Sequence, residues 1–403
     1  MSLFSTIDLW KPKLRLNTDI LPICKIKQIE KITLISSYSS VDIKKGDYVK
    51  TGQKISQDCI SPYTGTVENI RYIKGLDFKN LTSITLLIQS KDECTGNIEN
   101  IPNIKEDSRD SLLSALGKLG YKYNPNCSVD TVIINVLDRD PICTVNHQIF
   151  RENTGLLPGC IELIKKISGC NRIVLAITKQ LYNIAKKNIG DEAEIVSIEP
   201  VYPNGLPEIL VNLIFPDEKD TTRKSIIDME CLLSMFLALK NGKPYQEKVI
   251  TLTAPRQSIE KNIQIKIGTP LSEIFKEFDI VLEEEGKVII NGVMNGVAWY
   301  NFNYPVTDSI HSIMVQNKKD VYKTENNPCI SCGKCVAVCP VNLQVNLISR
   351  YSEFRLFEEC LRLDVESCIE CGLCAYSCTA HRPLVHYIRH AKVTINQKKE
   401  EIA

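Results

Sequence analysis

Short alternating runs of hydrophobic and polar residues fill the first hundred positions. In VDIKKGDYVKTGQKI, which starts at Val41, short apolar positions alternate with polar ones, and Gly46 and Gly52 interrupt them at turns. The stretch SPYTGTVENI repeats the pattern around Gly65. Two-residue periodicity broken by glycine turns predicts strands and hairpins. We therefore expect a flattened all-β barrel over residues 1–100.

The glycine-bounded motifs of this barrel resemble those of biotinyl/lipoyl-like domains. Those domains carry patterns similar to V-x-x-G-D-x-V-x-x-G-Q and S-P-x-x-G-x-V, which match the segments above. A carrier domain would present a lysine at its hairpin tip, and SPYTGT contains none. We interpret the region as a structural barrel-sandwich domain.

Apolar runs alternate with amphipathic segments between residues 101 and 245. VDTVIINVL and RIVLAIT read as buried strands, whereas SLLSALGKLGYKY, LLPGCIELIKKIS and LYNIAKKN have helical spacing. This alternation predicts a Rossmann-like α/β domain with a parallel sheet. Such sheets bind ligands beyond the carboxyl ends of their strands. Asp138 and Asp140 follow the first strand there; we expect them to lie in a solvated loop, with cofactor binding as the alternative.

Two further domains are predicted downstream. Over residues 246–315, KVITLTAP, KNIQIKIGTPLSEIFKEFD and KVIINGVMNGVAW indicate strands around a short helix, as in a β-grasp (SLBB-like) fold. Over residues 316–403, leucine and phenylalanine recur at helical intervals between two cysteine runs. The whole chain is thus expected to be an α/β multidomain protein that ends in a helical ferredoxin-type module.

Composition and charge restrict the class of protein. The chain has 403 residues and a formal net charge of +1, which gives no reason to expect nucleic-acid binding. No secretory signal or membrane-spanning run is evident, so we expect a cytoplasmic protein, with peripheral attachment to the cytoplasmic membrane through partners as an option. Nine of the 17 cysteines lie between Cys329 and Cys378, and the others are scattered, which is typical of reduced thiols and a metal site.

The clustered cysteines form two matching runs, CISCGKCVAVC and CIECGLCAYSC, each with the spacing C-x2-C-x2-C-x3-C. The eight predicted ligands are Cys329, Cys332, Cys335, Cys339, Cys368, Cys371, Cys374 and Cys378. This spacing is typical of two [4Fe–4S] clusters, in which the fourth Cys of each run binds the other cluster. We therefore expect the first three cysteines of run one to join Cys378, and those of run two to join Cys339. Structural zinc is the alternative.

The order of these segments resembles the RnfC family of the Rnf electron-transport complex over nearly the whole chain. The barrel, the α/β segment, VYPNG, KIGTPLSEI, NGVMNG and the paired cysteine runs all occur in the family's order. The family is similar in part to the flavin- and NADH-binding subunit of respiratory complex I. The resemblance therefore implies FMN and NADH at the α/β domain, in addition to the clusters.

Three glycine-dependent motifs of the family depart from its pattern here. The loop G-x-G-G-A-x-F-P aligns with GKLGYKYN, in which Gly117 and Gly120 remain as candidate cofactor contacts while Tyr121 and its neighbours replace small residues. The strand exit N-G-A-E-C-E-P has become NVLDRDP, and G-G-P-M-x-G has become NGVMNG. Glycines at such sites let the backbone approach flavin and phosphates. We expect that FMN and NADH do not bind productively.

Three functional hypotheses follow. The first is an iron–sulfur electron-transfer subunit of an Rnf-like complex, relaying electrons between protein partners. The second is an enzyme, an NADH-oxidising FMN subunit that feeds the same clusters. The third is an electron donor to a soluble reductase, resembling the RnfC-like proteins associated with amino-acid reductases. No general acid, base or nucleophile of a catalytic site is evident in the sequence.

Overall fold

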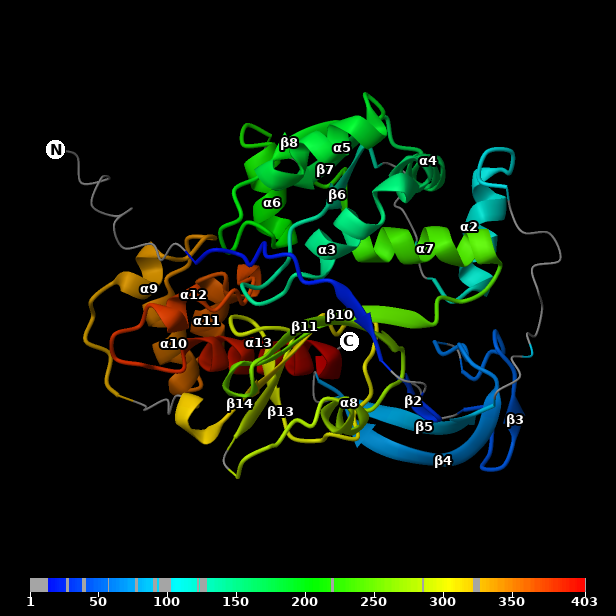
Figure 1. Cartoon of the computed structure of the whole chain (residues 1–403). Coiled ribbons are helices and arrows are strands. Elements are labelled where there is room, and N and C mark those ends of the chain that lie inside the picture. The colour runs from blue at the N-terminus through cyan, green and yellow to red at the C-terminus, as the bar shows by residue number, and fades with distance from the viewer. Residues whose placement is uncertain are drawn as a thin grey trace.

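The computed structural model describes residues 14–26, 29–37, 41–56, 58–76, 79–89, 93, 103–121, 123, 129–218, 221–284, 286–321 and 327–402. The predictions that concern Lys122, Asn124, Cys94, Cys127 and the first 13 residues lie outside these ranges. Three sheets and a C-terminal group of helices make up the fold (Figure 1). No helix in the described ranges is long and apolar enough to cross a membrane.

A four-stranded antiparallel sheet forms the N-terminal β region. Its strands are β2 (Lys31–Ser36), β3 (Tyr48–Val49), β4 (Gly65–Lys74) and β5 (Asn80–Ile88), in the order β2-β5-β4-β3. Gly46 and Gly52 have φ angles of 93° and 83°, which explains why glycine occupies these turns. β1 (Ile23–Lys25), which falls in the range 1–100 predicted as barrel, pairs instead with a strand of another sheet.

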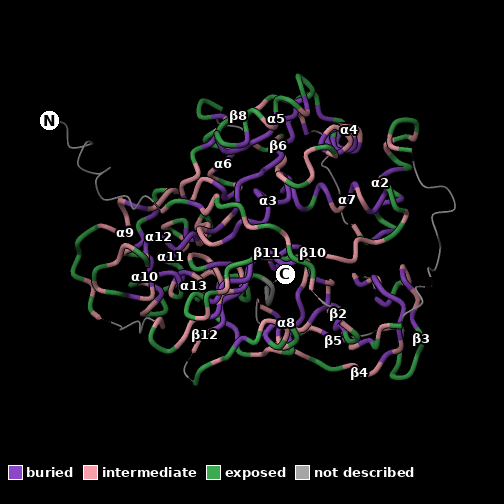
Figure 2. Tube along the Cα trace, viewed as in Figure 1, coloured by how far each residue is buried: buried purple, intermediate pink, exposed green. Residues whose placement is uncertain are grey.

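The central sheet has four parallel strands in the order β8-β7-β6-β9. They are β6 (Thr131–Asn135), β7 (Arg172–Ile177), β8 (Glu194–Ser197) and β9 (Lys224–Asp228). The helices of this region are α2 (Arg109–Lys118), α3 (Val145–Glu152), α4 (Leu157–Ser168), α5 (Tyr182–Ile189), α6 (Pro207–Ile214) and α7 (Met229–Asn241). Figure 2 shows buried positions along β6, α3 and α7 and exposed ones on the outer loops.

Successive residues of β6 belong to different hydrophobic cores. Val132 and Ile134 join the core formed with α2, α4, α5 and α7. Ile133 joins a second core, which includes Tyr202 and Leu210 of α6 and extends to Leu373 in the C-terminal module. Alternation of side chains across a strand explains this division. The second core therefore joins the α/β region to the cysteine-bearing module.

A six-stranded sheet, in the order β1-β11-β10-β14-β12-β13, follows the α/β region. Its elements are β10 (Glu247–Ala254), β11 (Ile259–Lys266), α8 (Leu271–Glu277), β12 (Lys287–Ile290), β13 (Val297–Trp299) and β14 (Ser312–Gln316). The Gly-Thr-Pro turn lies between β11 and α8, as expected from KIGTPLSEIFKEF, and Gly268 has a φ of 93°. The loop between β12 and β13 carries NGVMNG, residues 291–296.

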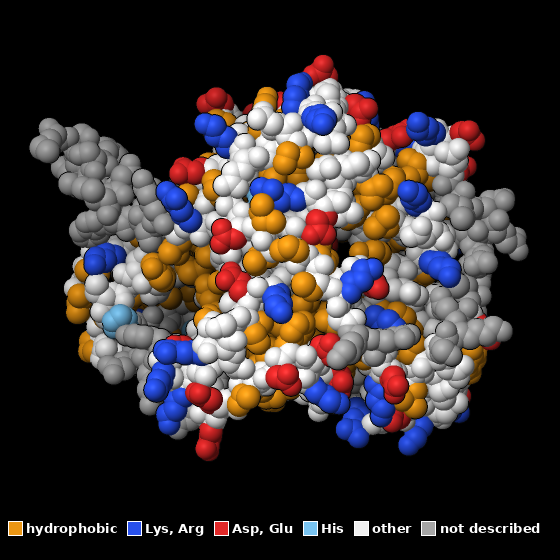
Figure 3. Space-filling view, viewed as in Figure 1, with side chains coloured by type: hydrophobic (Ala, Val, Ile, Leu, Met, Phe, Trp, Pro, Cys, Tyr) orange, Lys and Arg blue, Asp and Glu red, His pale blue; other side chains and the backbone are white. Residues whose placement is uncertain are grey.

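The C-terminal module is helical, as predicted. It consists of α9 (Lys334–Ala337), α10 (Val345–Glu353), α11 (Phe357–Arg362), α12 (Leu373–Tyr376) and α13 (Leu384–Ile402). These helices lie at one end of the molecule, and α13 runs from there toward its middle (Figure 1). Basic and acidic side chains are interspersed over the face drawn in Figure 3, in keeping with the near-zero net charge.

Candidate metal centre

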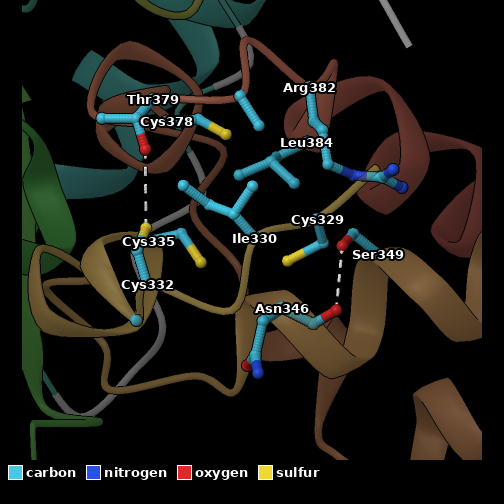
Figure 4. A pocket seen from close by; sticks show the side chains of 12 residues that line it. Cys329, Ile330, Cys332, Cys335, Asn346, Ser349, Cys378, Thr379, Arg382 and Leu384 are labelled. Atoms are coloured by element: carbon cyan, nitrogen blue, oxygen red, sulfur yellow. Dashed lines mark hydrogen bonds between the residues drawn. The ribbon is translucent and has the colours of Figure 1, made fainter. Parts of the chain in front are cut away.

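The first group of thiols lines a single cavity in the C-terminal module. Cys329, Cys332 and Cys335 of the first run face it together with Cys378 of the second run (Figure 4). Ile330 and Arg382 also line the cavity, as do Asn346 and Ser349 of α10. The chain therefore brings together the four cysteines that the spacing rule assigned to one cluster. We call these four thiols site A.

The remaining predicted ligands form a second group, site B, made of Cys368, Cys371, Cys374 and Cys339. Burial raises the pKa of the Cys371 thiol to about 11, and Cys339 and Cys368 add to this effect through their charges. Burial and the other three thiols of the group raise the pKa of Cys374 in the same way. Thiolates are the ligands that iron–sulfur clusters require, and a bound cation would offset their mutual repulsion.

The two runs repeat the same backbone geometry at an interval of 39 residues. Ser331 and Glu370 have φ angles of 55° and 54°, and Gly333 and Gly372 have φ angles of 74° and 78°. The short helices α9 and α12 begin at equivalent positions. Because each fourth Cys joins the opposite group, the two halves interlock. Removing either run would take thiols from both groups.

Backbone amides point at the sulfurs of both sites. The N–H of Ser331 donates to Cys329 Sγ and the N–H of Glu370 donates to Cys368 Sγ, each at 3.4 Å. Leu343 donates in the same way to Cys339 Sγ at 3.4 Å. Hydrogen bonds to cluster sulfurs are among the factors that set a reduction potential. The module thus has the donors, as well as the thiols, that a cluster uses.

Thr379 follows the last cysteine of the second run, where a proline, Pro340, follows the last cysteine of the first. Its Oγ1 lies 3.7 Å from Cys332 Sγ, across the cavity of site A. The backbone N–H of Lys334 and this hydroxyl together lower the pKa of the Cys332 thiol. The difference between the two runs therefore adds a polar contact to site A.

The described residues include no group of three or more His, Cys, Asp or Glu side chains that could hold a single metal ion. A [4Fe–4S] cluster makes a different demand, since it requires four thiolates spread around a larger object. The four-thiol cavity of site A fits that demand better than it fits one zinc ion.

Site B lies against the rest of the protein, whereas site A reaches the surface. Cys371 and Cys374 are buried, but Cys332 is exposed. The Tyr202 hydroxyl donates a hydrogen bond of 2.5 Å to the Cys371 carbonyl. A Cβ at Gly372 would lie 2.2 Å from the carbonyl oxygen of Met294, so only glycine fits against the 291–296 loop. Site B is therefore held by the α/β region and the six-stranded sheet.

Charged side chains also differ between the sites. At site B, Glu370 accepts hydrogen bonds from Arg389 Nε (2.6 Å) and Lys392 Nζ (3.0 Å), both from α13. Burial would raise the pKa of Glu370, but these two partners lower it overall. At site A, Arg382 pairs with Glu353 at 2.6 Å.

The acidic residues after β6 are buried, so the expectation of a solvated loop is wrong. Asp138 accepts hydrogen bonds from the amides of Asn146 (2.9 Å) and His147 (3.3 Å) at the start of α3. Asp140 accepts from the amides of Val293 (3.1 Å) and Met294 (2.9 Å) in the 291–296 loop. Asp138 and Asp140 are each only 3% exposed. Both candidate cofactor contacts are engaged within the protein.

Other polar groups at the carboxyl edge of the sheet pair with each other. Asn135 Nδ2 donates to Asp228 Oδ1 at 3.1 Å and to the Gly205 carbonyl at 3.2 Å. Arg139 forms an ion pair of 2.5 Å with Asp228. A ligand at this edge would have to displace these partners.

The glycine-poor stretch that begins at Gly117, in the last turn of α2, does not contribute to this edge. Gly117 has no neighbour within 4 Å of a built Cβ, and the nearest atoms to such a Cβ at Gly120 belong to Ile60. Tyr121 and Tyr123 pack against the core formed with α4 and α7. The structure therefore does not bring Gly117 and Gly120 to Asp138 and Asp140 through any contact among the described residues.

Sequence reasoning missed four residues that position site B. Tyr202, Glu370, Arg389 and Lys392 all contact the second cysteine run. Glu370 lies inside that run, and an acidic residue between the cysteines is a signal that a cationic partner would be needed nearby. The pairing of Tyr202 with Cys371, by contrast, spans 169 residues and has no local signal.

Comparisons with known proteins agree on the C-terminal module and on the wider chain. Residues 321–379 match the family model of the 4Fe-4S dicluster domain. The C subunit of an ion-translocating oxidoreductase complex from Methanosarcina acetivorans is 27% identical, over 89% of this chain and 90% of its own length. The C subunit of a proton-translocating ferredoxin:NAD(+) oxidoreductase complex from Clostridium ljungdahlii is 25% identical, over 89% and 85%. A solved NAD+-reducing [NiFe]-hydrogenase aligns at a TM-score of 0.49 with 11% identity, over 72% of this chain and 63% of that chain.

Proposed function

Since the chain belongs to the RnfC family, we propose that it is an iron–sulfur electron-transfer subunit of an Rnf-type redox complex. Two [4Fe–4S] clusters, one held by site A and one by site B, relay electrons between protein partners. The observation that carries this proposal is the interlocked pair of four-thiol groups. Each cluster would be bound by three cysteines of one run and the fourth of the other.

We propose further that FMN and NADH do not bind at the carboxyl edge of the parallel sheet. The support is that Asp138, Asp140 and Asn135 already bond within the protein there. The Gly205 backbone also packs tightly, since a Cβ on it would lie 2.1 Å from the Asp138 carbonyl oxygen. The chain's own electron centres would then be the two clusters alone.

The finer architecture is also a proposal. We assign residues 1–100, apart from β1, to a barrel-sandwich domain, 101–245 to a Rossmann-like domain, 246–315 together with β1 to an SLBB-like domain and 316–403 to the dicluster domain. The proposed partners are other subunits of an Rnf-type complex, and membrane attachment would be peripheral and mediated by them.

A second function has one observation in its favour. The name of the Clostridium ljungdahlii relative includes NAD(+), so an NADH-oxidising FMN subunit that feeds the same clusters is the alternative. Donation of electrons to a soluble reductase is a third option, to be distinguished by which proteins co-purify with this chain.

The deciding measurement uses protein purified without oxygen. We expect about eight irons and eight acid-labile sulfides per chain, as two four-iron clusters require, and no flavin after denaturation. NADH should not reduce an artificial acceptor. Stoichiometric FMN with NADH oxidation would replace our proposal with the second function. Bound zinc with little iron would exclude both. As a control, Cys231→Ser, outside both sites, should leave the iron content unchanged.

A further inference from the structure

The two sites differ in charge at equivalent positions of the internal repeat. Glu370 of site B corresponds to Ser331 of site A, 39 residues earlier, and Lys392 corresponds to Glu353. Arg389 corresponds to another arginine, Arg350. The backbone is the same at the first pair, because both residues have a φ near 55° and both donate to a ligand sulfur at 3.4 Å. Only the side chains differ.

At site B these side chains form a triad that touches the second cysteine run. Lys392 Nζ donates to the Cys368 carbonyl at 2.9 Å and to Glu370 at 3.0 Å. Arg389 bridges Glu370 (2.6 Å) and the Asn295 carbonyl of the 291–296 loop (2.8 Å). All three side chains are about a quarter to a third exposed, so water screens them only in part. Two cations against one carboxylate leave one net positive charge at the site.

At site A the charged groups are arranged differently: Lys334, inside the first run, acts on the Cys332 thiol through its positive charge. Arg382 lines the cavity, and its side chain is only 4% exposed. It pairs with Glu353, the residue that replaces lysine in this half, and also donates to the Asn327 carbonyl at 2.9 Å. This pair is neutral overall. The repeat therefore surrounds two similar thiol groups with different charged side chains.

We infer that the Glu370–Arg389–Lys392 triad sets the reduction potential of the cluster at site B. This inference rests on the proposed function, because it requires clusters at both sites. A reduced cluster carries one more negative charge than an oxidised one. A fixed positive charge nearby therefore favours the reduced form and raises the potential, whereas a fixed negative charge lowers it.

The inference predicts that two substitutions in the triad shift the reduction potential of site B in opposite directions. Glu370→Gln removes a negative charge and should raise the potential of site B. Lys392→Gln removes a positive charge and should lower it. Each change should alter the ratio of reduced to oxidised cluster at a fixed potential on the order of tenfold, which corresponds to about 59 mV for one electron. A purely structural role for the triad would give no such opposition.

The test is an anaerobic redox titration of the whole chain followed by electron paramagnetic resonance. Cys332→Ser, at site A, identifies which signal belongs to that site. Lys392→Arg keeps the charge and should leave the potential of site B unchanged. Glu366→Gln, which removes an exposed ion pair with Lys399 beside the same run, is the matched control and should shift neither site.

The outcomes separate this inference from the proposed function. Wild-type protein without iron would defeat the proposed function itself. Clusters at both sites whose potentials move in the same direction in Glu370→Gln and Lys392→Gln, or do not move, would overturn the inference alone. If Glu370→Gln loses iron, Lys392→Gln and Lys392→Arg still test the inference, because only Lys392→Gln removes a charge. A lower potential of site B in Lys392→Gln than in Lys392→Arg would support it, and equal potentials would overturn it.

Discussion

Asp138 shows how a single buried carboxyl links the β6–α3 connection to pH. Burial raises its pKa to about 7, although the amides of Asn146 and His147 and the Cys143 thiol work against this shift. The carboxyl is therefore protonated in the folded chain at pH values where it is ionised in the unfolded chain. The folded state then binds more protons between about pH 4 and 7, and the free energy of unfolding falls as pH rises through this window.

Replacing Asp138 with Asn should remove this dependence. Between pH 5 and pH 7, deprotonation of Asp138 should lower the free energy of unfolding of the wild-type chain by about 2–3 kcal/mol, at about 1.4 kcal/mol per pKa unit. In Asp138→Asn the loss should be smaller by that amount. Urea unfolding at several pH values measures it. An equal pH slope in the two proteins would show that Asp138 does not titrate in this range.

At the scale of elements, the fit of α12 against the 291–296 loop depends on Gly372. Both Gly333 and Gly372 occupy the left-handed region, so alanine at either position costs about 1–2 kcal/mol of backbone strain. Only at Gly372 would the new Cβ also collide with a backbone atom, the Met294 carbonyl oxygen at 2.2 Å. At Gly333 nothing lies within 4 Å. The two glycines therefore form a matched pair.

We expect Gly333→Ala to lower the unfolding free energy by about 1–2 kcal/mol and Gly372→Ala to lower it by about 3 kcal/mol or more, because the loop must also move. Thermal unfolding compares the two variants, and iron content reports on the sites. An equal loss of unfolding free energy in both variants would mean that the 291–296 loop moves away from residue 372 without an energetic penalty.

At the scale of the whole molecule, a buried ion pair joins the α/β region to the six-stranded sheet. Glu230 of α7 accepts from Lys248 Nζ at 2.7 Å and from the Val249 amide at 3.2 Å, both in β10. His311 Nδ1 lies 3.5 Å from the same carboxylate. Both members of the main pair are at most about 10% exposed. Removing one partner would leave a buried, uncompensated charge.

Lys248→Met should therefore cost about 3–5 kcal/mol of unfolding free energy. Lys186→Met, which breaks an exposed ion pair with Asp191, should cost less than about 1 kcal/mol. Denaturant unfolding of both variants tests this difference. A similar small loss in each would indicate that Glu230 is neutralised or solvated when Lys248 is absent.

The sequence predicts features that depend on neighbouring residues better than it predicts contacts between residues far apart in the chain. The helical C-terminal module and the alternating strands and helices around β6 and β7 followed from periodicity. The placement of β1 did not, because its pairing with β11 joins residues about 240 positions apart. The burial of Asp138 and Asp140 also escaped prediction, since two acids in a strand exit look solvated until α3 and the 291–296 loop are packed on them.

The sequence by itself determined the two cysteine runs, their spacing and hence the kind of centre they suit, because a cluster-binding loop is local. It also determined which segments are helices and strands, through the period of their hydrophobic positions. Only the tertiary structure decided that the carboxyl edge of the parallel sheet is occupied by its own Arg139–Asp228 ion pair and by the 291–296 loop. It alone placed Arg389 and Lys392 on Glu370, because contacts made when the chain returns upon itself leave no pattern in neighbouring residues.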